Sequence, residues 1–469
     1  MLVVDLDGTL LRTDMLYETF CAAVARDWRN VFLALPALTR GPAELKRFLA
    51  DAATLDVATL PYDEAVLSLI NDHQNSGGRT ALVSAAHHDL VTAIAGHLGV
   101  FDEAFGSDGK TNLKGRAKGA FLEERYGYEG FTYVGDSSAD LEVWNRASSI
   151  VTANASPRVR LRAEQLDRPV RHLPTEARPA LEYLRALRPH QWLKNLLVFI
   201  PLLAGHRLDL PTLGESLVAF ISFCLVASSV YVMNDLVDLP SDRDHPRKRF
   251  RAFASGKVPL AHGLVMLPTL LLAGFSLAML AGWPFVLIMI VYFTLTTGYS
   301  LVLKRHMVID ICTLAILYTS RIVAGALATG ISLSVWLLAF SLFFFFALAA
   351  LKRQVELIDI ASRDGMNARG RGYHVDDLAI LSPTVLASGY VSVLVLALYV
   401  ASDDVTLLYS QPAALWGVCV ILFYWITRVA LLANRGCIDD DPIVFALSDR
   451  ASHLCLAGIL AFAIAGALL

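Results

Sequence analysis

The chain lacks the features that mark several large protein classes. Its six cysteines are scattered along the sequence: Cys21, Cys224, Cys312, Cys419, Cys437 and Cys455. None stands in a Cys-x-x-Cys pair, which argues against a zinc site or a disulfide framework. The formal net charge is only −3, so overall charge suggests no nucleic-acid partner. No leader segment precedes the apolar residues Val3 and Val4, and we expect the N-terminal part to stay in the cytoplasm.

Charged residues are also scarce, at 18% of the 469 residues, and the scarcity is local. Up to about Arg185 the content of charged and polar residues is ordinary, whereas beyond Leu196 apolar runs dominate and bring the mean hydropathy to +0.51. A soluble domain followed by a polytopic membrane domain explains this step. We expect a soluble domain over 1–155, a charged and proline-punctuated linker over 156–187, and a membrane domain over 188–469.

Strands and helices alternate in the first part of the chain. We predict strands within 1–11, 80–84 and 131–134, and helices within 15–75, 89–98, 118–126 and 139–146. This alternation favours a parallel, Rossmann-like α/β sheet. The long helical insert after the first strand, about 14–76, would form a cap over it.

The polar motifs follow the predicted strands. Asp5 and Asp7 come directly after the apolar Val3-Val4, Ser84 stands at the end of the next strand, and Asp136 follows Gly135. The carboxyl ends of the strands in a parallel sheet are where such folds place their sites. Two neighbouring carboxylates suit a nucleophile and a proton-transfer group, with a magnesium ion to offset phosphate repulsion.

With Lys118 opening a helix and Asp140 closing the last motif, these elements resemble the haloacid dehalogenase-like phosphatases, in the phosphoserine-phosphatase-like branch with a helical cap. The resemblance implies that Asp5 attacks phosphorus and that Asp7 acts as general acid and base. It implies a magnesium site made by Asp5, Asp136 and the carbonyl of Asp7, with Asp140 in support. Ser84 would bind the transferring phosphoryl group and Lys118 would neutralise it, with Lys114 as a rival for that lysine.

Nine apolar runs follow, most of them near the ~20 residues that a helix needs to cross a bilayer. The predicted spans are 193–208, 212–233, 260–281, 283–303, 308–329, 333–351, 378–401, 411–432 and 451–469. Lysine and arginine gather in alternate loops, and the longest of these loops are 234–258 and 352–377. By the positive-inside rule these loops face the cytoplasm, as the soluble domain does.

An aspartate-rich segment follows the second predicted span. Asp235, Asp238 and Asp242 are spaced i, i+3, i+7, which places them on one face of a helix, and Asn234 lies one turn from Asp238. Such a cluster at a membrane surface requires neutralisation by a metal ion or by cations. The basic residues that follow, from Arg243 onward, fit a metal-diphosphate site, although a topology signal or a lipid headgroup contact explains them equally.

This segment resembles the Asn-Asp-x-x-Asp-x-x-x-Asp motif of the UbiA superfamily of membrane transferases, which have nine helices. The second aspartate-rich motif of that superfamily is not met cleanly, because Lys352-Arg353-Gln-Val-Glu356 stands in its place. Together with Arg188–Asn195 and Tyr299–Lys304, this stretch resembles the decaprenyl-phosphate phosphoribosyltransferases. In that branch a polyprenyl phosphate is the nucleophile, phosphoribosyl pyrophosphate donates the sugar, and pyrophosphate leaves.

The resemblance implies that Asp235, Asp238 and Asp242 hold Mg²⁺ against the leaving pyrophosphate. The candidate binding residues for the donor or the lipid phosphate are Lys194, Asn234, Arg243, Arg249, Tyr299, Lys304, Lys352, Arg353 and Glu356. Each basic residue alone could equally be an interfacial anchor. Asp310, at the start of the fifth predicted span, faces either the site or a partner helix. Arg321, in the middle of that span, must face protein or a polar cavity rather than lipid.

We therefore predict a bifunctional enzyme of a bacterial-type inner membrane that depends on Mg²⁺ in both domains. Its membrane domain would join 5-phosphoribose to a polyprenyl phosphate, and its soluble domain would remove the 5-phosphate. A second hypothesis is a prenyltransferase acting on an aromatic acceptor, with a separate phosphatase activity. A third is a lipid or ion transporter with a regulatory soluble domain.

Overall fold

The computed structural model describes residues 1–108, 112–174, 180–362, 371–438 and 442–468. Its chain divides into two compact units. Unit 1 contains residues 1–189 together with 231–269, and unit 2 contains residues 190–230 together with 270–469. The aspartate-rich segment 235–242 therefore belongs to the same unit as the N-terminal α/β fold.

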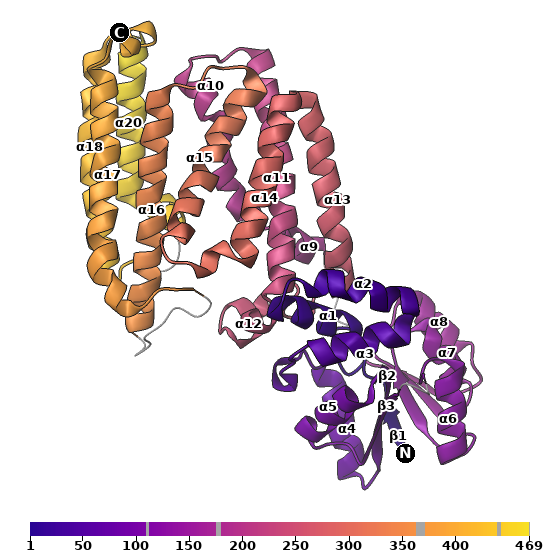
Figure 1. Ribbon diagram of the computed structural model, residues 1–469. Coiled ribbons are helices and arrows are strands. Elements are labelled where there is room, and N and C mark those ends of the chain that lie inside the picture. The colour runs from indigo at the N-terminus through magenta and orange to yellow at the C-terminus, as the bar shows by residue number, and fades with distance from the viewer. Residues whose placement is uncertain (109–111, 175–179, 363–370, 439–441, 469) are drawn as a thin grey trace. The chain divides into compact units, whose positions relative to one another are not determined.

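A six-stranded, all-parallel sheet forms the centre of unit 1 (Figure 1). Its strands are β1 (Leu2–Val4), β2 (Thr80–His87), β3 (Glu103–Ser107), β4 (Thr132–Gly135), β5 (Ser149–Thr152) and β6 (Val170–His172). The strand order is β3-β2-β1-β4-β5-β6. The central position of β1 buries it on both faces, which explains why Leu2, Val3 and Val4 are all apolar. The predicted α/β fold is confirmed.

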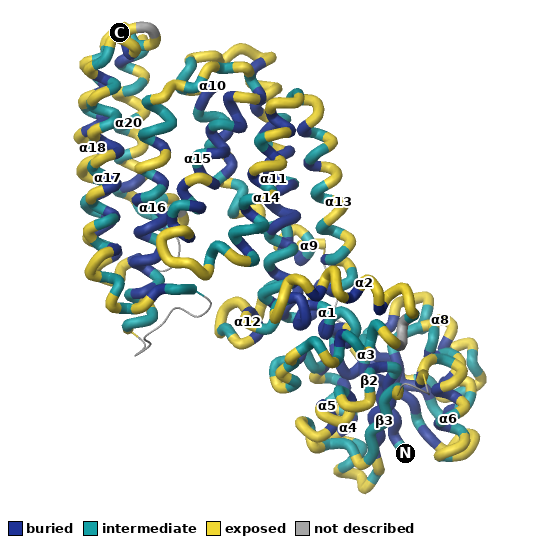
Figure 2. Tube along the Cα trace, viewed as in Figure 1, coloured by how far each residue is buried: buried dark blue, intermediate teal, exposed yellow. Residues whose placement is uncertain are grey.

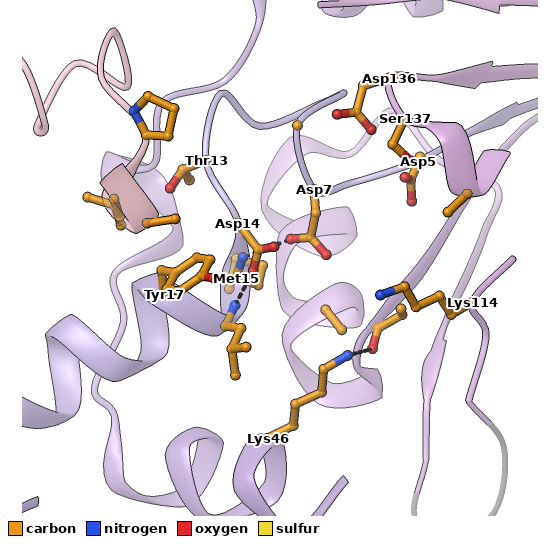
Figure 3. A pocket seen from close by; sticks show the side chains of 18 of the residues that line it. Asp5, Asp7, Thr13, Asp14, Met15, Tyr17, Lys46, Lys114, Asp136 and Ser137 are labelled. Atoms are coloured by element: carbon orange, nitrogen blue, oxygen red, sulfur yellow. Dashed lines mark hydrogen bonds between the residues drawn. The ribbon is translucent and has the colours of Figure 1, made fainter. Parts of the chain in front are cut away.

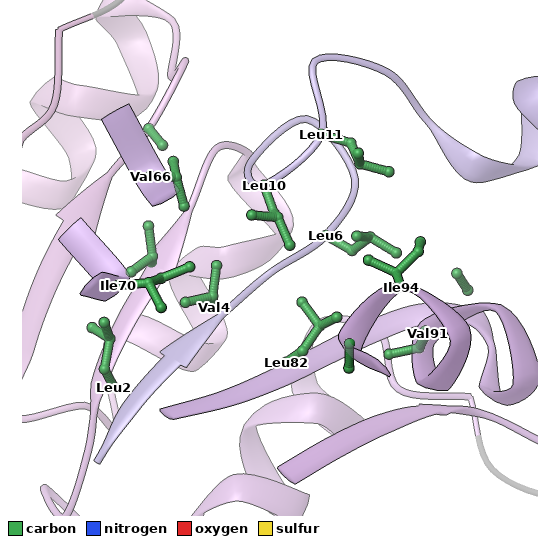
Figure 4. Close-up of a cluster of buried hydrophobic side chains, with 14 of the residues drawn as sticks. Leu2, Val4, Leu6, Leu10, Leu11, Val66, Ile70, Leu82, Val91 and Ile94 are labelled. Atoms are coloured by element: carbon green, nitrogen blue, oxygen red, sulfur yellow. The ribbon is translucent and has the colours of Figure 1, made fainter. Parts of the chain in front are cut away.

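Helices cover the sheet and fill the insert after β1. The helices of unit 1 are α1 (Met15–Arg26), α2 (Asn30–Arg40), α3 (Pro42–Ala52), α4 (Glu64–Asn75), α5 (His88–Leu98), α6 (Arg116–Tyr126), α7 (Leu141–Trp144), α8 (Pro157–Glu164), α9 (Ala180–Ala186) and α12 (Leu239–Asp244). Figure 4 shows the core on one side of the sheet, where Val4 and Leu82 meet Ile70 of α4 and Ile94 of α5. This packing fixes the loop that carries Asp5 and Asp7, because Leu6, Leu10 and Leu11 belong to the same core.

The sheet extends into the stretch 156–187 that we expected as a linker. This stretch contains α8 and β6, and β6 pairs in parallel with β5, with Ile150 opposite Val170. Ser156 caps α8 by accepting a hydrogen bond from the amide of Val159, and Pro157 occupies the first turn.

Unit 2 is helical (Figure 1). Two helices, α11 (Leu210–Val237) and α13 (Leu260–Ala278), contribute residues to both units. The remaining long helices are α14 (Trp283–Leu301), α15 (Ile309–Thr329), α16 (Val335–Ala361), α17 (Leu378–Val400), α18 (Leu415–Asn434) and α20 (Arg450–Leu468), with the short α19 (Pro442–Ser448) between the last two. In the described part of the chain, eight helices are long and apolar enough to cross a membrane.

The first predicted span, 193–208, is not confirmed as a membrane helix. It forms the 3₁₀ segment η3 (Pro189–Phe199) and the short helix α10 (Ile200–Ala204), which Gly205 ends. Asn195, Val198 and Leu202 of this segment are buried. The backbone of Gly325 in α15 approaches the carbonyl of Val198 so closely that a Cβ at Gly325 would overlap it. The segment therefore packs against protein, which explains why a continuous 20-residue apolar helix is not needed here.

Candidate functional site

The loop after β1 carries Asp5 and Asp7 in a fixed conformation. The amide of Asp5 donates to the carbonyl of Val134 at 3.0 Å, and the Oδ1 of Asp7 accepts from the amide of Met15 at 2.8 Å. Between them and the cap lies Gly8, whose φ is +74°. A Cβ on Gly8 would lie 2.4 Å from the Oδ2 of Asp136, so only glycine lets the two acidic loops come this close.

A chain of buried hydrogen bonds joins the two acidic loops through one lysine. Lys118 Nζ donates to Asp5 Oδ1 at 2.6 Å and to Tyr133 Oη at 2.9 Å. Tyr133 Oη in turn donates to Asp140 Oδ1 at 3.0 Å. Lys118, rather than its rival Lys114, therefore contacts Asp5, and Tyr133 is a member of the network that sequence inspection missed.

Asp136 and Asp140 belong to the loop after β4. Asp140 Oδ2 accepts hydrogen bonds from the amides of Asp136 and Ser137, at 3.2 and 3.0 Å. Carboxylate oxygens of Asp5, Asp136 and Asp140 lie within 4.8 Å of one another. Three hard oxygen donors at this spacing fit a magnesium ion, and the ion's double charge would relieve the repulsion among them.

Burial perturbs the titration of this site. Burial raises the pKa of Asp5 to about 6, against the lowering effect of Lys118. Burial also raises the pKa of Asp7 to about 7, with repulsion from Asp14 adding to it, and raises that of Asp136 to about 8, with repulsion from Asp5. For Lys118, burial lowers the pKa, but the carboxylates of Asp5 and Asp140 outweigh it and the net pKa is raised. At neutral pH the Lys118–Asp5 pair is therefore charged, while Asp7 titrates near the pH at which a proton-transfer group works best.

These acids open into a cavity of about 590 Å³ (Figure 3). At the edge of this group, the Ser84 hydroxyl donates a hydrogen bond to Asp7 Oδ2 at 3.3 Å. Figure 3 shows Lys46 of α3 and Lys114 approaching the cavity across from Asp7, and Lys46 Nζ donates to the carbonyl of Ala85 at 2.8 Å. Burial lowers the pKa of Lys46. Two cations opposite the carboxylates suit a phosphate group bound between them.

A segment far along the chain completes the cavity wall. Residues 259–262, which include the first turn of α13, line it together with Thr13. The Thr13 hydroxyl is buried and has no hydrogen-bond partner in the part of the chain that the structure describes. A ligand in the cavity would lie beside the start of a helix whose composition suits a membrane span.

A buried ion pair joins the cap to the segment that precedes this wall in the chain. Arg243 makes two hydrogen bonds to the carboxylate of Glu18 in α1, at 2.8 and 2.6 Å, and a third to the carbonyl of Ala254 at 3.1 Å. Both side chains of the ion pair are almost fully buried. Nearby, the Tyr183 hydroxyl and His262 Nδ1 are 2.7 Å apart. Arg243, expected to bind a substrate anion, is thus engaged by the chain's own carboxylate.

In the aspartate-rich segment, arginines accompany the carboxylates. Asp235 pairs with Arg188 and with Arg251 at 3.3 Å, and Asp242 pairs with Arg251 at 2.5 Å. Burial raises the pKa of Asp242, against the lowering effect of Arg251. Asn234 and Asp238 are half-buried one turn apart, with the amide of Asp238 bonded to the carbonyl of Asn234 at 2.7 Å. Arg188 and Arg251 had no assigned role in the sequence interpretation.

The other predicted anion-binding residues are spread over both units. In unit 1, Arg249 is exposed and its guanidinium lies 4.9 Å from the ring centre of Phe250. In unit 2, Lys194, Lys304 and Lys352 are half-buried, and the ammonium of Lys194 lies 5.9 Å from the ring centre of Tyr318.

A second charged cluster lies within unit 2. Arg353 Nε donates to Asp310 Oδ2 at 2.5 Å, and Arg353 also pairs with Glu356. Tyr299 donates to Asp310 Oδ1 at 2.8 Å, and Arg371 Nε lies 3.2 Å from Glu356. The structure thus brings together Tyr299, Arg353 and Glu356 of the predicted set, around Asp310.

Arg321 of α15 lies apart from these clusters and has its own hydrogen-bond partners. Its Nε donates to Asn195 Oδ1 at 2.9 Å and its Nη2 to Tyr292 Oη at 3.2 Å, and the rings of Phe223 and Tyr318 flank the guanidinium. The charge faces protein rather than lipid, as expected for a membrane helix. Asn195, from η3, is a polar partner that the sequence interpretation missed.

Comparison with known proteins covers both parts of the chain. The sequence model of the UbiA prenyltransferase family matches residues 196–446, and that of the haloacid dehalogenase-like hydrolases matches residues 2–144. The uncharacterized protein y4nM of Sinorhizobium fredii is 38% identical over 96% of this chain and 88% of its own length. The nodulation protein NoeC of Azorhizobium caulinodans is 36% identical over 60% of this chain and 92% of its own.

A third relative is the decaprenyl-phosphate phosphoribosyltransferase of Mycolicibacterium smegmatis, which is 34% identical over 58% of this chain and 87% of its own length. The two family matches fall on the two chemically different parts of the chain, the α/β fold and the apolar helices. The protein is an integral membrane member of the UbiA prenyltransferase family that carries a haloacid dehalogenase-like hydrolase domain at its N-terminal end.

Proposed function

We propose that the protein transfers 5-phosphoribose from phosphoribosyl pyrophosphate to a polyprenyl phosphate, and that the Asp5 cavity then removes the 5-phosphate from the lipid-linked product. The observation that carries this proposal is the make-up of that cavity. Asp5 and Asp7 share it with residues 259–262, where α13, a helix suited to a membrane span, begins. A phosphomonoester in this cavity can therefore be attached to a lipid whose chain stays in the bilayer.

In the phosphatase half-reaction, the Asp5 carboxylate attacks phosphorus while the bond from phosphorus to the ester oxygen breaks. Asp7 gives its proton to the leaving alkoxide, then takes a proton from a water that attacks the phospho-aspartate and releases inorganic phosphate. Lys118, held 2.6 Å from Asp5, orients the nucleophile and offsets negative charge. Asp5, Asp136 and the carbonyl of Asp7 would hold Mg²⁺, with Asp140 in support, and the ion would supply charge stabilisation for the phosphoryl group.

In the transfer half-reaction, an oxygen of the polyprenyl phosphate forms a bond to the anomeric carbon of the donor, and the bond from that carbon to pyrophosphate breaks. Asp235, Asp238 and Asp242 are our candidates for holding Mg²⁺ against the leaving pyrophosphate. The chemistry of Arg188 and Arg251 suits the same anion, because arginine forks match phosphate oxygens. We assign Lys194, Asn234, Arg249, Lys304, Lys352 and Arg353 to the donor or the lipid phosphate, and Tyr299 and Glu356 to the reacting sugar.

We also propose a membrane orientation and a cellular location for the protein. The lysines and arginines of the loops 234–258 and 352–377 favour placing those loops, and with them the phosphatase, on the cytoplasmic side of a bacterial inner membrane. Support for the phosphoribosyl donor comes from the decaprenyl-phosphate phosphoribosyltransferases that align with 34–40% identity. Covalent linkage would keep the phosphatase at high effective concentration near the transfer product.

Purified protein in lipid vesicles tests the transfer step. With Mg²⁺, radiolabelled phosphoribosyl pyrophosphate and decaprenyl phosphate, we expect label to enter the organic phase. A parallel reaction receives a prenyl diphosphate and an aromatic acid in place of the sugar donor, because membership of the UbiA prenyltransferase family favours that reaction as a second candidate. Product only in the second reaction would contradict the phosphoribosyl assignment.

A further inference from the structure

The cap helix α2 (Asn30–Arg40) has the reverse of the burial pattern that is usual for a helix of a soluble domain. Its small residues Ala34 and Ala37 are buried, and its large apolar residues are exposed. The exposed side chains are Trp28 (39%), just before the helix, and Val31 (39%), Phe32 (62%), Leu33 (56%), Leu35 (54%) and Leu38 (56%). Figure 2 shows α2 exposed along most of its length.

Specific contacts set this orientation. The Asn30 side chain donates to the carbonyl of Ala23 in α1 at 2.8 Å, which fixes the rotation of α2 about its axis. Ala34 packs with Ala23 and Leu49 in the small core of the cap. Trp28, Val31, Phe32, Leu35 and Leu38 follow the spacing i, i+3, i+4, i+7, i+10, so they form one continuous stripe on the opposite face.

A stripe of this kind needs an apolar partner. Scattered exposed apolar residues are normal on a soluble surface, whereas a contiguous apolar stripe marks an interaction site. The stripe also has the composition of a membrane-interfacial helix, with Trp, Phe and Leu on one face and arginines at both ends. Arg26 and Arg29 flank Trp28 at one end of the stripe, Arg40 follows Leu38 at the other, and no acidic residue stands between Asp27 and Glu44.

From these observations we infer that α2 lies in the interface of the bilayer, with its apolar stripe in the acyl region and its terminal arginines at anionic headgroups. The charge pattern favours this occupant, because arginines at both ends of the stripe, with no acidic residue between Arg29 and Arg40, complement an anionic membrane surface. The same unit contains the start of α13, a candidate membrane span, so a bilayer is available to it. This inference concerns how the cap is held and does not depend on which phosphate the cavity hydrolyses.

Photo-crosslinking of the full-length protein tests the inference. The crosslinking amino acid p-benzoylphenylalanine replaces Phe32 in one sample and Tyr128 in the other. Tyr128 is a matched control, since it is aromatic, belongs to unit 1 and is 58% exposed. Each protein is reconstituted in vesicles of phosphatidylcholine with one quarter phosphatidylglycerol and a trace of alkyne-tagged phosphatidylcholine.

We expect lipid adducts at position 32 to exceed those at position 128 by at least about fivefold. We also expect Arg29→Gln together with Arg40→Gln to lower the yield at position 32 in the anionic vesicles but not in pure phosphatidylcholine. Equal lipid yields at positions 32 and 128 would overturn the inference. A crosslinked product of twice the protein mass at position 32, without lipid adduct, would also overturn it and assign the stripe to a second copy of the chain.

Discussion

The two acidic groups of unit 1 differ in what lies next to each carboxylate. In the Asp5 cavity, Asp5, Asp136 and Asp140 lie close to one another, and Lys118 pairs with Asp5. In the aspartate-rich segment, Asp235 and Asp242 lie beside the arginines Arg188 and Arg251. The first arrangement leaves negative charge that a metal ion can offset directly. In the second, a metal ion and its diphosphate must displace the arginines or share the carboxylates with them.

The largest effect that separates the two groups is expected from Asp7→Asn. Removing the proposed proton-transfer group should lower phosphatase kcat by about 10²–10⁴-fold, because the leaving alkoxide then departs unprotonated. Transfer of the pentose should be unchanged. Release of inorganic phosphate and entry of label into lipid, measured on the same preparation, check both statements. Equal loss of the two activities would show that the acidic groups are not functionally separate.

The converse substitution is Asp235→Asn. Loss of one of the carboxylates that we propose to hold Mg²⁺ against pyrophosphate should lower pentose transfer by roughly 10²-fold or more. Phosphatase turnover of a soluble phosphomonoester should stay within about twofold of the unmodified protein, since Asp235 does not line that cavity. Asp244→Asn is the matched control, as Asp244 is exposed at the end of α12. Transfer unaffected by Asp235→Asn would remove this segment from the transferase mechanism.

A link between the two regions is tested by Glu18→Gln. The substitution leaves the Arg243 guanidinium buried without its carboxylate, and breaking such a pair costs about 3–5 kcal/mol. We expect unit 1 to lose its phosphatase activity at lower denaturant concentration. Glu124→Gln, at an exposed position of α6, should change the free energy of unfolding by less than about 0.5 kcal/mol. Identical denaturation curves for the two variants would contradict a structural role for the ion pair.

The smallest predicted effect is a pH dependence of metal binding at the Asp5 cavity. Burial raises the pKa of Asp5 to about 6 and that of Asp136 to about 8, and Mg²⁺ binds the ionised carboxylates. Protons therefore compete with the metal ion at pH 6, and affinity should increase toward pH 8 by up to about tenfold per pH unit for each displaced proton. Calorimetric titration with Mg²⁺ measures this. Asp136→Asn should flatten the dependence, and equal affinity at pH 6 and pH 8 in the unmodified protein would contradict it.

Local sequence patterns predicted the parts of the molecule that depend on local physics. The apolar run Leu2–Val4 and the alternation of strands with helices predicted the parallel sheet, because a strand buried on both faces needs apolar residues. The long apolar runs predicted the membrane helices, because a helix in lipid needs apolar residues too. The same reasoning put Asp5 and Asp136 at the carboxyl ends of strands, and the structure shows that these strands, β1 and β4, are neighbours in the sheet.

Contacts between distant residues could not be predicted in this way. Nothing local to Glu18 marks it as the partner of Arg243, 225 residues away, and nothing in 259–262 marks it as a wall of the Asp5 cavity. Tyr133 looked like an ordinary strand residue, and only the fold brings its hydroxyl to Lys118 and Asp140. The segment 193–208 is apolar enough to resemble a membrane span. Its apolar residues instead pack against protein, at α15.

The order of the two reactions is the central feature of the proposed function, and mass spectrometry of lipid products from Asp5→Asn protein tests that order directly. With phosphoribosyl pyrophosphate and decaprenyl phosphate, the unmodified protein should yield a lipid-linked pentose without the 5-phosphate. The Asp5→Asn protein should accumulate the lipid-linked phosphopentose, heavier by one phosphoryl group. The same lipid product from both proteins would contradict the proposed sequence of transfer and dephosphorylation.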